Sequence, residues 1–249
     1  MSNPRAVAFD LDSTLAVSKS PVTPHMGALL ARLIATRPVG IMSGGKWAQF
    51  QKQVLTALPT DANLSNFYLF PNCAGYCYHF ENGEWQLLDD HSLTEVEQTT
   101  IREALDSSMK ETGFDKPPEQ VWGERIDFRG ASFAFSSLGQ EAPVEVKETW
   151  DPDKEKRRPL HALLVARLPD FEIKMNAMTT IDITRKGVSK ALGVRKFSEL
   201  TGIPIGEMLY IGDALFPGGN DEVVKETGIP TKQTIGPDQT ALYIEEMLG

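Results

Sequence analysis

The 249-residue sequence contains only two cysteines, no long apolar run and no basic cluster. Without a run of about eighteen apolar residues, a membrane-spanning helix is not expected. The first residues lack a basic stretch followed by an apolar one, so no secretory signal is predicted and we expect a cytoplasmic protein. Twenty-five basic against thirty-four acidic residues give a formal net charge of -9, which argues against nucleic acid as a partner.

The two cysteines are Cys73 and Cys77, and no second Cys or His pair completes a zinc site with them. We interpret them as a pair of buried, reduced thiols. Hydrophobic residues make up 41% of the chain and charged residues 24%, so one large or two small domains can bury an ordinary core.

Three short apolar segments each lead into polar residues: 6–9 before Asp10, 39–42 before Ser43, and 208–211 before Gly212. Between the first two, Thr23-Pro24 predicts the start of a helix whose apolar residues recur at helical spacing. Apolar residues at helical spacing also continue over 47–58. This alternation predicts an α/β unit with a doubly wound, Rossmann-like parallel sheet, whose ligands lie at the carboxyl ends of the strands.

The middle of the chain has a different pattern. Asn82-Gly83 predicts a hairpin turn between strands 77–80 and 84–88. A helix follows with a capping box from Thr94 to Glu97 and Val96, Ile101, Leu105 and Met109 on its apolar face. Strands are expected near 133–135, 171–175 and 180–183. We therefore expect a core formed by residues 1–82 and 187–249, with residues 83–186 inserted as an α+β cap.

Four polar segments suit phosphate chemistry. Asp10 and Asp12 end the first strand, Ser43-Gly44-Gly45 provides a hydroxyl and unhindered N–H groups for an anion, Lys190 begins the returning helix, and a glycine-rich acidic loop carries Asp213 and Asp221. Each segment alone has an ordinary structural interpretation, such as a solvated strand end, a turn with an N-cap, or a surface lysine. Their occurrence in one order is far more specific.

That order resembles the haloacid dehalogenase superfamily of phosphotransferases over nearly the whole chain. The longer acidic loop, Gly212 to Asp221, resembles that of the phosphomannomutase branch. The same resemblance matches Phe128-Arg129-Gly130 to a segment that carries a cap arginine, and Thr180 and Asp182 to a cap serine and aspartate, which implies that these residues bind the substrate. It implies an Mg²⁺-dependent enzyme acting on a small phosphorylated substrate.

The chain departs from the phosphomannomutases where a cationic clamp is needed. Gln140 stands where they carry an arginine, and Lys147 and Lys19 replace two others. A mutase must hold a bisphosphate in two orientations, so these changes favour a sugar phosphate phosphatase, with phosphomannomutase as the alternative. The substrate and the oligomeric state are left open.

The resemblance also implies roles for the residues of the core. Asp10 attacks phosphorus and forms an aspartyl-phosphate, and Asp12 protonates the leaving group and then activates water. Ser43 and Gly44 bind phosphoryl oxygens while Lys190 balances charge. Mg²⁺ is assigned to Asp10, the carbonyl of Asp12, Asp213 and Asp221, the last directly or through water.

Two other classes of protein, phospho-receiver switches and catalytically silent scaffolds, fit the sequence less well. Phospho-receiver switches also combine acidic residues, a hydroxyl and a lysine, but they are about half this length and lack an inserted cap. A catalytically silent scaffold has nothing in its favour, since every motif residue is present.

Overall fold

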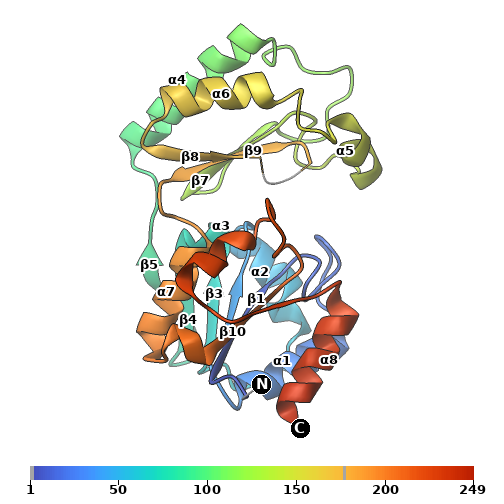
Figure 1. Cartoon of the computed structure of the whole chain (residues 1–249), viewed down its shortest axis with the longest axis vertical. Coiled ribbons are helices and arrows are strands. Elements are labelled where there is room, and N and C mark those ends of the chain that lie inside the picture. The colour runs from blue at the N-terminus through green and yellow to red at the C-terminus, as the bar shows by residue number, and fades with distance from the viewer. Residues whose placement is uncertain (1–2, 176–177) are drawn as a thin grey trace. The chain divides into compact units, whose positions relative to one another are not determined.

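The computed structural model describes residues 3–175 and 178–249. The chain divides into two compact units, Met1–Asp90 with Val188–Gly249 and His91–Gly187 (Figure 1). No helix within the described residues is long and apolar enough to cross a membrane.

The first unit is built on a seven-stranded sheet in the order β11-β10-β1-β2-β3-β4-β5. The strands from β11 to β3 run parallel, and β4 and β5 are antiparallel. Every residue of β1, β2 and β3 is buried, as expected for strands covered on both faces. The strands are β1 (Ala6–Asp10), β2 (Val39–Met42), β3 (Phe67–Phe70), β4 (Tyr76–Glu81), β5 (Glu84–Asp90), β10 (Met208–Gly212) and β11 (Thr231–Gln233).

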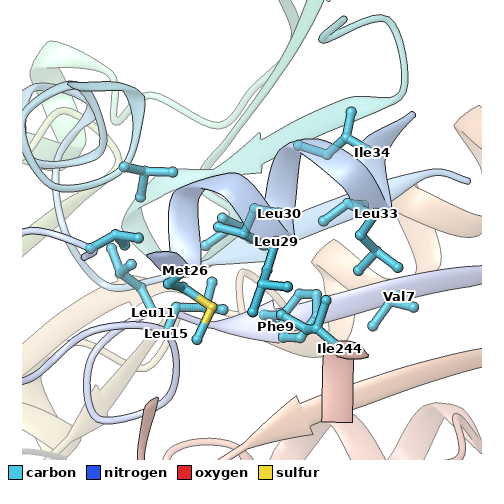
Figure 2. Packing of buried hydrophobic residues seen from close by; sticks show 14 of the residues in the cluster. Val7, Phe9, Leu11, Leu15, Met26, Leu29, Leu30, Leu33, Ile34 and Ile244 are labelled. Atoms are coloured by element: carbon cyan, nitrogen blue, oxygen red, sulfur yellow. The ribbon is translucent and has the colours of Figure 1, made fainter. Parts of the chain in front are cut away.

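Helices cover both faces of this sheet. Helix α1 begins where the sequence predicts, because the Thr23 hydroxyl accepts a hydrogen bond from the Met26 N–H at 3.2 Å. Its apolar side packs on Phe9 of β1 and Ile244 of α8 (Figure 2). Phe197 of α7 packs in the cluster on the other face. The helical segments of this unit are α1 (Pro24–Ile34), α2 (Trp47–Gln53), η1 (Leu55–Ala57), α3 (Pro71–Ala74), α7 (Lys190–Thr201), η2 (Ile205–Glu207), η3 (Glu222–Thr227) and α8 (Pro237–Leu248).

The second unit is a four-stranded antiparallel sheet in the order β6-β7-β9-β8. Its apolar cluster joins Phe133 and Phe135 of β7 to Ile101 of α4 and Leu164 of α6. Helices α4 and α6 lie together on one face of the sheet (Figure 1). The elements are α4 (Glu95–Thr112), β6 (Ile126–Phe128), β7 (Ser132–Ser136), α5 (Val144–Trp150), α6 (Arg158–Arg167), β8 (Phe171–Lys174) and β9 (Thr180–Arg185).

Three expectations differ from the structure. Strand β5 pairs with β4 in the seven-stranded sheet, so the first unit extends to Asp90 and a boundary after residue 82 would cut the hairpin. The helix expected over 47–58 ends at Gln53 and gives way to a 3-10 turn. Val96 is 75% exposed, because it lies five residues before Ile101 and therefore about 140° around the helix from the side that packs on the cluster.

The cysteines are both free thiols, but only Cys77 is fully buried and Cys73 is half-buried. Burial raises the pKa of the Cys77 thiol to about 12, which keeps it protonated and unreactive. The expectation of two buried thiols was therefore wrong for Cys73.

Candidate active site

The polar residues predicted at the strand ends of the first unit do meet. Asp10 is the last residue of β1, and Asp213 follows β10, its parallel neighbour. Oxygen atoms of Asp10, Asp213 and Asp221 all lie within 4.8 Å of one another. The parallel sheet places them together because the carboxyl ends of adjacent strands share one edge.

Lys190 supplies a positive charge inside this cluster. It is the first residue of α7 and is 2% exposed. Its Nζ donates to Oδ1 of Asp10 and, at 2.6 Å, to Oδ1 of Asp221. A buried ammonium is stable only when it is paired in this way.

The electrostatics of the cluster are dominated by burial. The pKa of Asp10 is raised to about 7, mainly by burial, with Lys190 opposing the rise and Asp221 adding to it. Burial raises the pKa of Asp213 as well, again with help from Asp221. Burial alone would lower the pKa of Lys190, but attraction to Asp10 and Asp221 holds it well above its usual value. One lysine thus faces three carboxylates, an excess of negative charge that suits a divalent cation.

The three carboxylates are not equally available to such a cation. Oδ1 of Asp221 accepts hydrogen bonds from Lys190 and, at 2.7 Å, from the Tyr210 hydroxyl. Oδ2 of Asp221 accepts from the Ala214 N–H at 3.1 Å. Asp213 is half-buried and accepts one long hydrogen bond, from the Thr14 hydroxyl at 3.3 Å. Asp10 and Asp213 therefore fit a hard cation, whereas Asp221 already serves as the counterion of Lys190.

Asp12 lies beyond the end of β1 and is held by two donors. The Lys19 backbone N–H donates to its Oδ1 at 2.6 Å, and the Gln49 side-chain amide donates to its Oδ2 at 3.3 Å. Lys19 has a φ of 60°, so the turn that carries it adopts a left-handed backbone to reach Asp12. The family resemblance implied a substrate contact for the Lys19 side chain, whereas the backbone contact of Lys19 with Asp12 was not expected from the sequence.

Ser43, Gly44 and Gly45 follow β2 as predicted. Ser43 is 3% exposed, and its Oγ accepts from the Gly45 N–H at 3.1 Å. A Cβ on Gly45 would lie 2.1 Å from Oε1 of Gln49, so glycine leaves room for the side chain that holds Asp12. The segment after β3 stabilises the loop that begins at Ser43, because the Cys73 N–H donates a hydrogen bond to the Ser43 carbonyl at 2.8 Å.

The predicted cap residues form a separate polar cluster in the second unit. Arg129 donates to Asp127 at 3.0 Å and to Oε1 of Gln140 at 3.3 Å, and its guanidinium lies 3.8 Å from Asp182. Lys147 Nζ donates to the Gln140 carbonyl at 3.1 Å. The cluster joins four predicted residues and adds Asp127, so the Arg129 guanidinium lies beside two carboxylates, Asp127 and Asp182.

Thr180 lies on β9, two residues before Asp182, and its carbonyl accepts from the buried Arg157 at 2.7 Å. That bond fixes the backbone of the strand that carries Asp182. Arg157 was not predicted from the sequence, and neither were Tyr210, Gln49 and Thr14 of the first unit. Tyr210 alone left a signal, as a polar aromatic residue in an otherwise apolar strand beside the acidic loop.

No family model matches the chain. A haloacid dehalogenase-like hydrolase from Bacteroides thetaiotaomicron superposes with a TM-score of 0.66 at 16% identity, covering 98% of this chain and 99% of that one. The chain has the haloacid dehalogenase-like hydrolase fold. The expected fold class, an α/β core with a parallel-dominated sheet and an inserted α+β unit, is confirmed.

Other members of this fold group are also similar. An IMP-bound, N-terminally truncated IMP-nucleotidase of Plasmodium falciparum superposes with a TM-score of 0.69 at 14% identity, covering 98% of this chain and 68% of that one. By sequence, the phosphomannomutase of Spinacia oleracea is 22% identical and that of Oryza sativa subsp. japonica 24%. Each match covers 94% of this chain, with 89% and 91% of the respective relative. The haloacid dehalogenase-like fold and these relatives together indicate an enzyme of the phosphatase or mutase type.

Proposed function

We propose that the protein is a divalent-cation-dependent phosphatase acting on a sugar phosphate or a similar small phosphorylated metabolite. The observation that carries the proposal is the buried cluster of Asp10, Lys190, Asp213 and Asp221, beside Ser43 and Gly44 at the same edge of the sheet. It combines a nucleophile, a balancing cation, hard oxygen ligands and an anion seat within one site.

The proposed reaction begins at Asp10. One carboxylate oxygen of Asp10 attacks phosphorus, the bond from phosphorus to the leaving oxygen breaks, and Asp12 gives that oxygen its proton. Water then attacks the aspartyl-phosphate, Asp12 takes its proton, and phosphate leaves. Lys190 donates a hydrogen bond to one oxygen of Asp10. This bond orients the carboxylate, and the other oxygen carries out the attack.

Ser43 and the Gly44 N–H are suited to hold the phosphoryl oxygens during this transfer. The cation most compatible with the donors is Mg²⁺, held by Asp10, Asp213 and the backbone carbonyl of Asp12. When bound, it supplies positive charge that screens the phosphoryl group from the carboxylates. Asp221 contributes indirectly by fixing Lys190.

The second candidate is phosphomannomutase activity, which the sequence relatives favour. Against it stands the composition of the Arg129 cluster. Asp127 and Gln140 already accept hydrogen bonds from Arg129, and Asp182 lies near its guanidinium. A second phosphate would compete with these contacts for the guanidinium, so the cluster suits a neutral, hydroxylated group better than a bisphosphate.

A screen of phosphorylated metabolites with Mg²⁺ tests the proposal. Each compound is incubated with and without a bisphosphate activator, and both free phosphate and isomerised product are measured. Phosphate release that is independent of the activator and abolished by chelation supports a phosphatase. Activator-dependent isomerisation with little free phosphate would support the mutase.

A further inference from the structure

Helix α2 holds the loop that carries Asp12 at two points. Gln53 is 3% exposed, and its side-chain amide donates to the Ser20 carbonyl at 2.7 Å. The Gln53 carbonyl accepts from the Val22 N–H at 2.8 Å. One turn earlier on the same side of the helix, Gln49 donates from Nε2 to Oδ2 of Asp12 at 3.3 Å. Gln53 therefore holds the backbone of the loop, whereas Gln49 reaches the side chain that the proposed reaction uses.

The two oxygens of Asp12 are held unequally. Oδ1 accepts a 2.6 Å hydrogen bond from the Lys19 backbone N–H, a donor that is fixed in a left-handed turn with a φ of 60°. Oδ2 accepts the longer bond, from the half-buried side chain of Gln49. A carboxylate oxygen has two lone pairs, so Oδ2 can keep Gln49 on one of them and face a reacting oxygen with the other. Oδ2 is therefore the oxygen of Asp12 that is suited to proton transfer.

The place of the Gln49 amide depends on Gly45. A Cβ at residue 45 would collide with the amide carbon and Oε1 of Gln49, so the amide lies directly over the glycine. These atoms are the far end of a flexible side chain, so an added methyl group would push the amide aside and leave the backbone in place. Gly45 follows Ser43 and Gly44, so the loop proposed to bind the phosphoryl group also leaves room for the contact with Asp12.

We propose that Gln49 is a positioning residue for the general acid and base of the reaction. It orients Asp12 so that Oδ2 faces the leaving oxygen. As the O–H bond of Asp12 breaks and the O–H bond of the leaving alcohol forms, the Gln49 N–H stabilises the negative charge that develops on Oδ2. The inference rests on the proposed phosphatase function, and it adds that activity on poor leaving groups depends on Gln49.

Two substrates that differ in their leaving group test the proposal. p-Nitrophenyl phosphate releases a stable anion that needs little protonation, whereas phenyl phosphate releases a poorer leaving group that needs the acid. The ratio kcat/KM reports the steps up to release of that group, before water attacks the phosphoenzyme. Gln49→Met removes the donor and keeps the length of the side chain. It should lower kcat/KM about tenfold for phenyl phosphate and less than about threefold for p-nitrophenyl phosphate.

Gly45→Ala is a second variant, which displaces the amide and leaves Gln49 in the sequence. It should also lower kcat/KM more for phenyl phosphate than for p-nitrophenyl phosphate. Combining it with Gln49→Met should change the ratio of the two kcat/KM values no further, because both substitutions remove one contact. An additional selective loss in the double variant would contradict the proposal.

Two other residues of α2 serve as controls. Gln51 is exposed, and Gln51→Met should leave both kcat/KM values unchanged. Gln53→Met removes the buried hydrogen bond to Ser20, so it should lower the melting temperature and change both kcat/KM values by the same factor. If wild type is active and Gln49→Met loses the same factor on both substrates, or none on either, the positioning role is overturned and the proposed function stands. A wild type that hydrolyses neither substrate with Mg²⁺ would overturn both.

Discussion

The hydroxyl of Tyr210 donates a 2.7 Å hydrogen bond to the same oxygen of Asp221 that accepts from Lys190. Both Tyr210 and Asp221 are fully buried. The hydrogen bond from Tyr210 holds the Asp221 carboxylate in place, and Asp221 accepts a hydrogen bond from Lys190. Lys190 in turn donates to Asp10 and so orients its carboxylate. A tyrosine inside an apolar strand thus helps to position the proposed nucleophile without touching it.

Tyr210→Phe tests this relay. It removes one hydrogen bond to a buried carboxylate and should lower the free energy of unfolding by about 1–3 kcal/mol. It should also lower kcat about tenfold with little change in KM, since Lys190 is held less firmly. Denaturant unfolding and steady-state kinetics measure the two effects. A variant with wild-type kcat would show that the bond is structural only.

Asp213 and Asp221 should respond differently to the same substitution. Asp213→Asn removes a proposed metal ligand, so it should raise the Mg²⁺ concentration needed for half-maximal activity while the apo protein stays folded. Asp221→Asn leaves Lys190 with one fewer counterion and should destabilise the apo protein by about 3–5 kcal/mol. Magnesium titrations and thermal melts of both variants, with and without chelator, distinguish the roles. If Asp213→Asn and Asp221→Asn destabilised the apo protein equally, these separate roles would be contradicted.

Glu97 should make the stability of the second unit depend on pH. Hydrogen bonds from Arg185 and from the Thr94 N–H and hydroxyl lower the pKa of Glu97 from 4.5 to about 2. Because the folded-state pKa is the lower one, the stabilisation is complete above pH 4.5 and is lost as the pH falls towards 2. At pH 7, wild type should be more stable than Glu97→Gln by roughly 1–2 kcal/mol and should have the higher melting temperature. The difference in melting temperature should disappear near pH 2–3. A gap that is the same at both pH values would contradict this.

The sequence predicted the strand ends of the core and the residues they carry. Asp10, Ser43, Lys190 and Asp213 could be located because each follows or begins an element marked by periodicity, capping or turn chemistry. Gln49, Tyr210 and the backbone of Lys19 could not, because their contacts depend on how a helix, a strand and a turn pack in three dimensions.

The expectations that were wrong or incomplete each have a physical cause. The Asn82-Gly83 turn was recognised, and both residues have a positive φ. However, a hairpin signal does not tell which sheet the hairpin joins, so β5 was assigned to the inserted unit. Val96 was grouped with Ile101 on the apolar face of α4, but residues five apart do not lie on the same side of a helix, and Val96 faces away from the cluster. Gln140 and Lys147 were expected to weaken a cationic phosphate clamp. The hydrogen bond from Arg129 to Asp127 could not be predicted from the sequence.

The balance between phosphatase and mutase should shift with the charge of the Arg129 cluster. Gln140→Arg together with Lys147→Arg replaces an acceptor of Arg129 by a second guanidinium. That change should favour a bound bisphosphate and raise the ratio of isomerised sugar phosphate to free phosphate. Interconversion of mannose 1-phosphate and mannose 6-phosphate is measured beside phosphate release. Gln140→Asn, which keeps an amide, is the control and should leave the ratio unchanged. An unchanged ratio in the double variant would mean that the cluster does not set the outcome.

The most direct measurement is the initial rate of phosphate release from a phosphomonoester substrate in the presence of Mg²⁺, for wild type and for Asp10→Asn. Circular dichroism and thermal melts check that the variant is folded, and its melting temperature should be lower than that of wild type because the buried Lys190 loses one of its two carboxylate partners. We expect turnover in wild type that chelation abolishes, and a rate at least a thousandfold lower in Asp10→Asn. A folded Asp10→Asn that releases phosphate at a rate near that of wild type would contradict it.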